Sequence, residues 1–82
     1  MIYNPTLESV LMVEEIIKKH SGELGKYQMW RKLPRKMMYQ TFQVIIDYLQ
    51  YSRKIVIEKS GKIVWIWNPV LIDKLVRQGL IK

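Results

Sequence analysis

The chain of 82 residues contains no cysteine and a single histidine, His20. Without cysteine there are no disulfide bonds and no thiol catalysis, and one histidine is too few for a zinc site, which takes about four Cys or His ligands. General acid–base and nucleophilic catalysis depend largely on the same two residue types. The carboxylates are scattered, and no phosphate-binding glycine motif is present. We therefore expect a protein that is not an enzyme and that uses no metal and no cofactor.

Long apolar runs are also missing. The longest, Ile63–Trp67, is far short of the roughly 20 residues that span a bilayer. The first residues, Met1–Pro5, lack the basic start and apolar stretch of a signal peptide. The sequence therefore predicts a single domain over residues 1–82 of a cytoplasmic protein, with no membrane contact and no evident small-molecule ligand.

Acidic residues are few and unevenly placed. Against 14 Lys and Arg there are 7 Asp and Glu, which gives a formal net charge of +7. The only charges up to Ile17 are Glu8, Glu14 and Glu15, and every basic residue lies from Lys18 onward. An acidic beginning and a basic body indicate a surface for a polyanion, and the charge favours nucleic acid over a basic surface that merely faces solvent.

The first part of the chain has the periodicity of an amphipathic helix. Apolar residues recur with a 3.6-residue period, which predicts a helix over residues 5–20. Asn4-Pro5 has the cap and the first-turn proline that open a helix, and Gly22 is suited to end it. Glu23-Leu24 then forms a connector with room for one rung of strand.

Two further helices follow. The second is short, over residues 26–33, because Pro34 cannot continue it. The third covers residues 37–51, although none of its candidate caps (Lys36, Met37 and Met38) caps well. Its apolar face consists of Met38, Phe42, Ile45, Ile46 and Leu49, and its polar stripe of Gln40, Gln43, Asp47 and Gln50. One face is expected to pack in the core and the other to face outward.

From residue 54 the sequence pattern changes from that of a helix to that of β-strands. Residues 54–67 are rich in β-branched and aromatic residues on both sides of Ser60-Gly61, which predicts a hairpin with a two-residue turn. This register places Ile57 opposite Val64 and Ile55 opposite Ile66. Both faces are largely apolar near the base of the hairpin, so we expect both to be covered.

A last helix is predicted over residues 69–78, opened by Asn68-Pro69 and ended by Gly79. Its apolar stripe consists of Leu71, Ile72, Leu75 and Val76. Three uses of this stripe are open: it covers the second face of the hairpin, it binds a partner protein, or it forms a homodimer.

Three stretches carry a family resemblance. Tyr27–Pro34 resembles the first helix of a helix-turn-helix, Tyr39–Leu49 a recognition helix, and Lys54–Trp65 a wing. From about Leu7 to Trp67 the chain resembles the winged helix-turn-helix family. It is similar to small archaeal winged-helix proteins in which an Asn-Pro-started helix follows the wing. The resemblance implies an α+β, mainly α, fold: a three-helix core, a β-hairpin wing and a C-terminal helix.

The resemblance also implies a function, that of a small transcription regulator on double-stranded DNA. The third helix of a winged helix enters the major groove, and the wing contacts phosphates or an adjacent groove. The implied base contacts are Lys36, Met37, Gln40 and Gln43. The implied backbone contacts are Arg31, Lys32, Arg35, Tyr39, Thr41, Lys59, Ser60 and Lys62. For Met37 two placements are open, at a base edge or inside the protein.

A plainer interpretation stands beside each of these. A stripe of Gln and Asp on an amphipathic helix is most often only its solvated face. What favours DNA is that the stripe coincides with a basic helix-helix turn and a basic hairpin tip. The alternative function is that of a winged-helix module for protein–protein interaction without a DNA role, because the same fold serves both.

Overall fold

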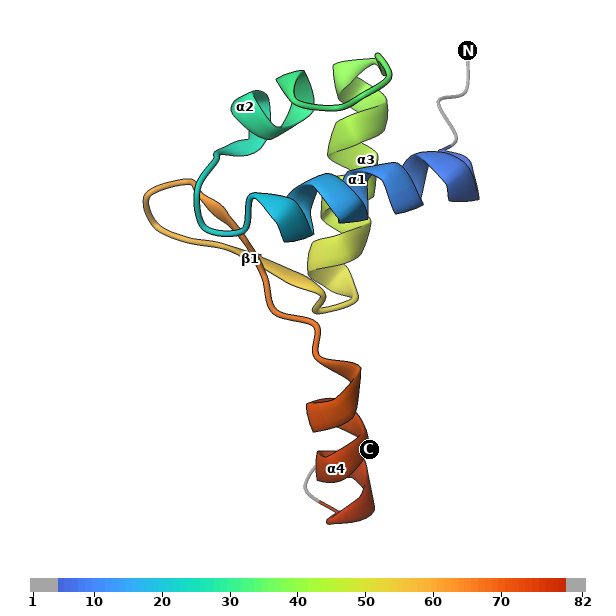
Figure 1. Ribbon diagram of the computed structural model, residues 1–82, viewed down its shortest axis with the longest axis vertical. Coiled ribbons are helices and arrows are strands. Elements are labelled where there is room, and N and C mark those ends of the chain that lie inside the picture. The colour runs from blue at the N-terminus through green and yellow to red at the C-terminus, as the bar shows by residue number, and fades with distance from the viewer. Residues whose placement is uncertain (1–4, 80–82) are drawn as a thin grey trace.

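The computed structural model describes residues 5–79 and contains four helices and one antiparallel hairpin in that range. In chain order the elements are α1 (Leu7–Lys19), α2 (Lys26–Arg31), α3 (Tyr39–Tyr51), β1 (Ile55–Ile57), β2 (Ile63–Trp65) and α4 (Pro69–Arg77). Figure 1 shows three helices packed around one centre, the hairpin beside them and α4 apart. The arrangement confirms a mainly helical α+β class and is compatible with a winged helix. Over the described residues, no helix combines the length and hydropathy needed to cross a membrane.

The hydrophobic core draws on every element except α4. Its fully buried side chains are Val13, Ile17, Met29, Phe42, Ile45, Ile46, Leu49, Ile55 and Ile63. The four from α3 recur at the spacing of one helical face, as the sequence predicts, whereas Met38 is exposed. Burying a side chain of this size contributes roughly 1.5–3 kcal/mol, so these nine residues dominate the stability of the fold.

Two helices begin later than predicted. The start of α1 is set by Thr6, whose hydroxyl accepts a hydrogen bond from the backbone N–H of Ser9 at 3.0 Å. The predicted opening at Asn4-Pro5 is therefore wrong by two residues, and Asn4 itself lies outside the described residues. Helix α3 begins after Met38, which is extended and provides no side-chain cap, as its residue type led us to expect.

The register of the hairpin differs from the predicted one. The strands pair through Ile55–Trp65, Val56–Val64 and Ile57–Ile63. The turn has three residues, 59–61. Gly61 allows this turn because it adopts φ +90°, and its N–H donates to the Glu58 carbonyl at 2.8 Å. Because side chains alternate along a strand, the shift places Trp65 rather than Ile66 opposite Ile55. Ile55 and Ile63 are thereby buried, while Val56 and Ile66 lie exposed on the outer face.

The connector between α1 and α2 pairs with β2. The Gly22 N–H donates to the Ile63 carbonyl at 2.8 Å, and the Ile63 N–H donates to the Leu24 carbonyl at 2.9 Å. A further bridge joins Gly25 to Lys62. The expected rung of strand is confirmed, and it holds the tip of the hairpin against Gly25, the residue just before α2.

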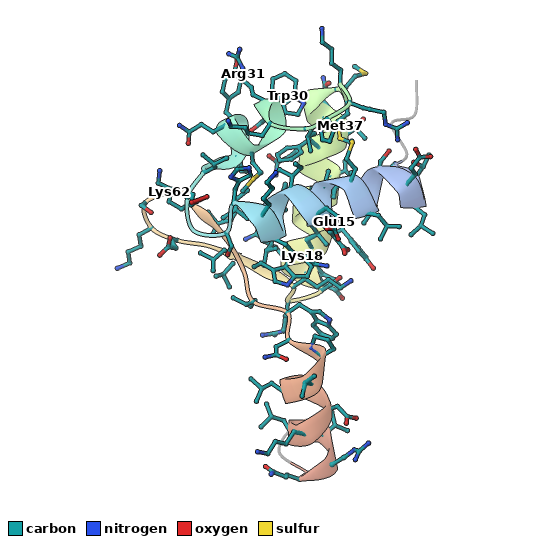
Figure 2. The ribbon with its side chains drawn as sticks, viewed as in Figure 1. Glu15, Lys18, Trp30, Arg31, Met37 and Lys62 are labelled. Carbon is teal, nitrogen blue, oxygen red and sulfur yellow. The ribbon has the colours of Figure 1, made fainter. Side chains whose placement is uncertain are left out.

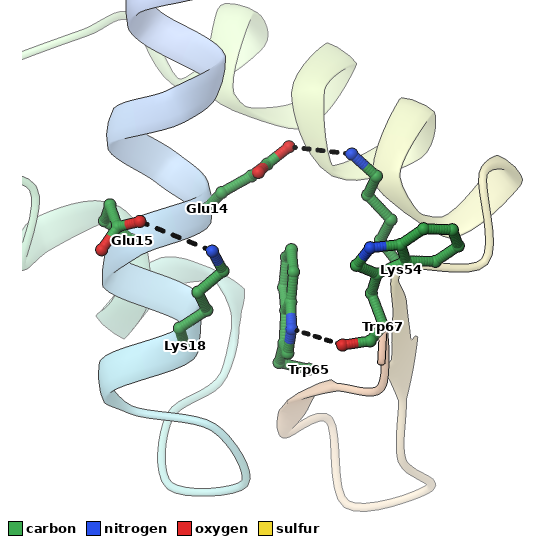
Figure 3. Close-up of polar contacts among 6 residues, drawn as sticks. All are labelled: Glu14, Glu15, Lys18, Lys54, Trp65 and Trp67. Atoms are coloured by element: carbon green, nitrogen blue, oxygen red, sulfur yellow. Dashed lines mark hydrogen bonds and ion pairs between the residues drawn. The ribbon is translucent and has the colours of Figure 1, made fainter. Parts of the chain in front are cut away.

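Helix α4 projects away from the rest of the structure, so the expectation that it covers the hairpin is wrong (Figure 1). The reason lies in the segment before it, where the Ile66 and Trp67 N–H groups both donate to the Lys54 carbonyl, at 2.9 and 3.1 Å. The Trp65 indole N–H donates to the Trp67 carbonyl at 3.0 Å (Figure 3). Only Asn68, which caps α4 by accepting from the Leu71 N–H, lies between this anchored segment and the helix.

Candidate nucleic-acid interface

The segment from α2 to α3 carries a cluster of exposed cations, which consists of Arg31, Lys32, Arg35 and Lys36. Figure 2 shows Arg31 directed away from the core, and its guanidinium carbon lies 5.8 Å from the centre of the Tyr27 ring. Arg35 differs from the others because its guanidinium forms an ion pair with Glu8 of α1. An anion that approaches Arg35 must compete with this carboxylate.

The polar face of α3 is tied to α2 by Lys26. The Lys26 ammonium donates to Oε1 of Gln43 at 3.3 Å, and Nε2 of Gln43 donates to Oδ1 of Asp47 at 2.8 Å. Both ends of the Gln43 amide are therefore engaged within the protein. Gln40, one turn earlier on the same face, is exposed. A bidentate contact to adenine needs both ends of an amide, so Gln40 is better placed for it than Gln43.

A groove of about 460 Å³ connects these elements to the hairpin. It is lined by Gly25, Lys26, Tyr27, Gln28, Tyr39, Ser60, Gly61 and Lys62. We call it the tip groove. Three of the predicted backbone contacts, Tyr39, Ser60 and Lys62, are brought together here, and Lys59 is exposed on the same loop (Figure 2 shows Lys62 at the hairpin tip). Two ammonium groups and several hydroxyls at one groove suit a phosphate backbone.

Two other predicted contacts lie deeper. Met37 is half-buried and packs against the core, and its carbonyl accepts a hydrogen bond from the Trp30 indole at 2.7 Å. Of the two placements left open for this side chain, the structure has the inner one. Thr41 is half-buried on α3. Tyr39 meets Trp30 edge to face, with 5.3 Å between the ring centres, which fixes the first turn of α3 on α2.

Sequence reasoning missed Lys26. Its position directly after Gly25 is the available signal, because a hairpin that pairs with the α1–α2 connector must reach the start of α2. Helix α3 itself contains no lysine or arginine, so the positive charge around it comes from neighbouring segments. Its outward face instead carries Tyr48 and Tyr51, exposed by 54% and 89%.

The predicted partner stripe lies on α4. Leu71 and Val76 are exposed by 48% and 46%, and Leu75 is half-buried. The side chain of Ile72 lies outside the described part of the structure. The stripe is therefore remote from the tip groove and at the opposite end of the molecule from α2 (Figure 1).

Comparison with protein-family models, with curated proteins and with solved structures found no match. The functional assignment of this chain depends on the geometry and charge described above. Because fold alone does not specify function, a proposed function must be argued from the residues at the tip groove and on α3.

Proposed function

We propose that this chain is a winged-helix DNA-binding protein, with the role of a small transcription regulator. In this proposal α3 enters the major groove of duplex DNA, with Gln40 at a base edge. The hairpin is the wing, and its tip lies along the phosphate backbone. Arg31, Lys32 and Lys36 contact phosphates on the other side of α3.

The observation that carries the proposal is the position of Lys26. This residue is hydrogen-bonded to Gln43 on the polar face of α3, and it also lines the tip groove with Lys62. The polar face of α3 and the hairpin tip are therefore neighbours on one surface. Each feature alone has an ordinary explanation, as a solvated helix face or a basic loop. Their position side by side is what supports DNA binding.

The charge distribution supports the same proposal. All 14 basic residues lie from Lys18 onward, and α3 itself contains no lysine or arginine. The exposed cations Arg31, Lys32 and Lys36 precede α3, and Lys59 lies on the hairpin loop that follows it. Such cations can contact the two phosphate strands while the helix lies between them. If about five to seven phosphates are contacted, log affinity falls against log salt with a slope of about −4 to −6.

The test compares the pair Lys59→Ser/Lys62→Ser with the matched pair Lys19→Ser/Lys74→Ser, which removes the same charge elsewhere. Binding to a duplex selected from random sequences is measured by fluorescence anisotropy over a series of salt concentrations. We expect the first pair to weaken all sequences alike and to reduce the salt slope by about two, with a small effect of the second. Equal losses in both pairs, or no binding by the unaltered chain, would contradict the proposal.

A second candidate function has its own observation. Val56 and Ile66 on the outer face of the hairpin are exposed by 42% and 45%, and Leu71 and Val76 of α4 are exposed by 48% and 46%. Apolar patches of this kind mark protein interaction sites. We therefore also propose that the α4 end of the molecule is a protein interaction surface, whether or not the other end binds DNA.

A further inference from the structure

The outer face of the hairpin forms a second groove, of about 550 Å³, at the end of α3 that lies away from the tip groove. It is lined by Gln50, Tyr51, Arg53, Ile55, Val56, Ile57 and Ile66. We call it the outer hairpin groove. Its walls are mostly aliphatic, and Arg53 stands exposed at its edge. In composition it suits the apolar side of an amphipathic helix.

Helix α4 has such a side but is held away from the groove of its own chain. The Lys54 carbonyl fixes the backbone of Ile66 and Trp67, and the Trp65 indole fixes the Trp67 carbonyl. With Asn68 as the only residue between this anchor and the helix, there is too little chain for α4 to fold back. Among the side chains that the structure describes, Leu71 and Val76 of α4 and the aliphatic residues of the outer hairpin groove thus form two uncovered apolar surfaces of one molecule.

We propose that α4 of one copy occupies the outer hairpin groove of a second copy, and that the second copy returns the same contact. The proposal rests on the second function proposed above, that the α4 end is an interaction surface, and it commits that surface to self-association. Leu71 and Leu75 of α4 would enter the groove beside Val56 and Ile66 of the partner subunit.

The short length of α4 favours a second copy over an unrelated partner. Helix α4 has nine residues and a length of about 13.5 Å, which is short for an interface on its own. A stable interface buries about 800 Å² on each partner. In a two-fold pair each copy contributes both a helix and a groove, so the buried area doubles without any further element. The contact is also closed, which limits the assembly to a dimer.

One pair of opposite charges can form across the proposed contact. Asp73 is the single acidic residue of α4, and it flanks the stripe while forming an ion pair with Arg77 at 3.0 Å. Arg53, at the edge of the groove, offers it a second cation from the partner subunit. Helix α4 as a whole carries a net charge of +1, because Lys74 and Arg77 lie on its other side, so the complementarity is confined to the Asp73–Arg53 pair. The tip groove, at the other end of α3, stays open in such a dimer.

Cross-linking tests the contact directly, because the chain has no cysteine of its own. Val56→Cys and Leu75→Cys are prepared separately, mixed and oxidised. We expect a disulfide between the two variants, formed at least about tenfold faster than either variant links to itself. The control partner is Val70→Cys, which is 79% exposed but lies on the side of α4 with Lys74 and Arg77. Faster self-linking by Leu75→Cys would show paired α4 helices and would overturn the groove assignment.

Sedimentation equilibrium tests the dimer itself. We expect the unaltered chain to dimerise, Leu75→Glu and Ile66→Glu each to weaken association by about tenfold or more, and Val70→Glu to leave it unchanged. Neither Leu75 nor Ile66 belongs to the buried core, so circular dichroism should show all variants folded. A chain that stays monomeric at millimolar concentration would overturn the dimer. A monomeric chain would leave the second proposed function standing, because α4 could still bind another protein. A binding measurement with that protein would test this role separately.

Discussion

The Lys54 ammonium lies 3.4 Å from a carboxylate oxygen of Glu14, so an ion pair joins the middle of α1 to the residue just before β1 (Figure 3). Glu14 is nearly buried, and Lys54 also lies 5.8 Å from the centre of the Trp67 ring. The Lys54 carbonyl accepts from Ile66 and Trp67. One residue therefore connects α1, the base of the hairpin and the segment that leads to α4.

Glu14→Gln should destabilise the fold by about 1–3 kcal/mol, because it leaves the partly buried Lys54 ammonium without its counter-charge. Thermal unfolding followed by circular dichroism would show a melting temperature lower by several degrees. The matched control is Glu15→Gln. Its ion pair with Lys18, at 3.5 Å, is exposed, so the change should stay within about 0.5 kcal/mol. Equal effects of the two changes would show that burial of the Glu14 pair is unimportant.

Gly61→Ala should cost about 1–2 kcal/mol, because an L side chain is strained at φ +90° although nothing lies within 4 Å of the added Cβ. Gly25→Ala is the control. It has φ −81°, and the added Cβ would make an ordinary contact, 3.4 Å from the Gly61 carbonyl oxygen. Urea unfolding of both variants measures the difference. A neutral Gly61→Ala would mean that the three-residue turn is not the one that the chain adopts.

Gln40→Ala should relax base preference at one position of the selected DNA site by about 1–3 kcal/mol, because its exposed amide is placed for a bidentate contact. Gln43→Ala should have a broader effect, since it releases Lys26 and Asp47 from their hydrogen bonds. Competition binding with single-base variants of the site distinguishes the two patterns. A preference unchanged by Gln40→Ala would exclude this residue from base recognition.

Glu8→Gln should strengthen DNA binding and make the salt slope steeper by about one, because it removes the carboxylate that pairs with Arg35. Glu15→Gln again serves as the control. It removes the same charge and releases Lys18, which lies beside Trp65 and away from the tip groove. If both changes strengthen binding equally, the gain comes from net charge and Arg35 has no special part in it.

Local sequence patterns predicted the parts of the fold that depend on local physics. The apolar spacing of α3 identified Phe42, Ile45, Ile46 and Leu49 as buried, and Asn68-Pro69 marked the start of α4. The strand character of residues 55–57 and 63–65 was also evident from their β-branched and aromatic side chains. Each of these features is decided by residues within a turn or two of one another.

The late start of α1 is a local error, but the errors in the hairpin register and in the position of α4 arose where distant residues decide. Ser60-Gly61 suits a two-residue turn, but burial of Ile55 and Ile63 on one face favours the three-residue turn instead. The position of α4 depends on hydrogen bonds to the Lys54 carbonyl, a backbone atom that no residue pattern reveals. The same limit applies to the candidate site. Lys26 and Gln43 are 17 positions apart, and only the packing of α2 on α3 brings them together.

The anchored segment before α4 has a practical consequence, because it holds two indoles. Trp65 and Trp67 are both partly buried and close to cations, with Lys18 at 4.9 Å and Lys54 at 5.8 Å from their ring centres. Tryptophan emission responds to the polarity around the ring, so an event at the base of α4 should register there without a dye. Trp30 lies with Arg31 and Met37 at the α2 end, and its replacement by phenylalanine would leave a protein whose tryptophan emission comes only from Trp65 and Trp67, just before α4.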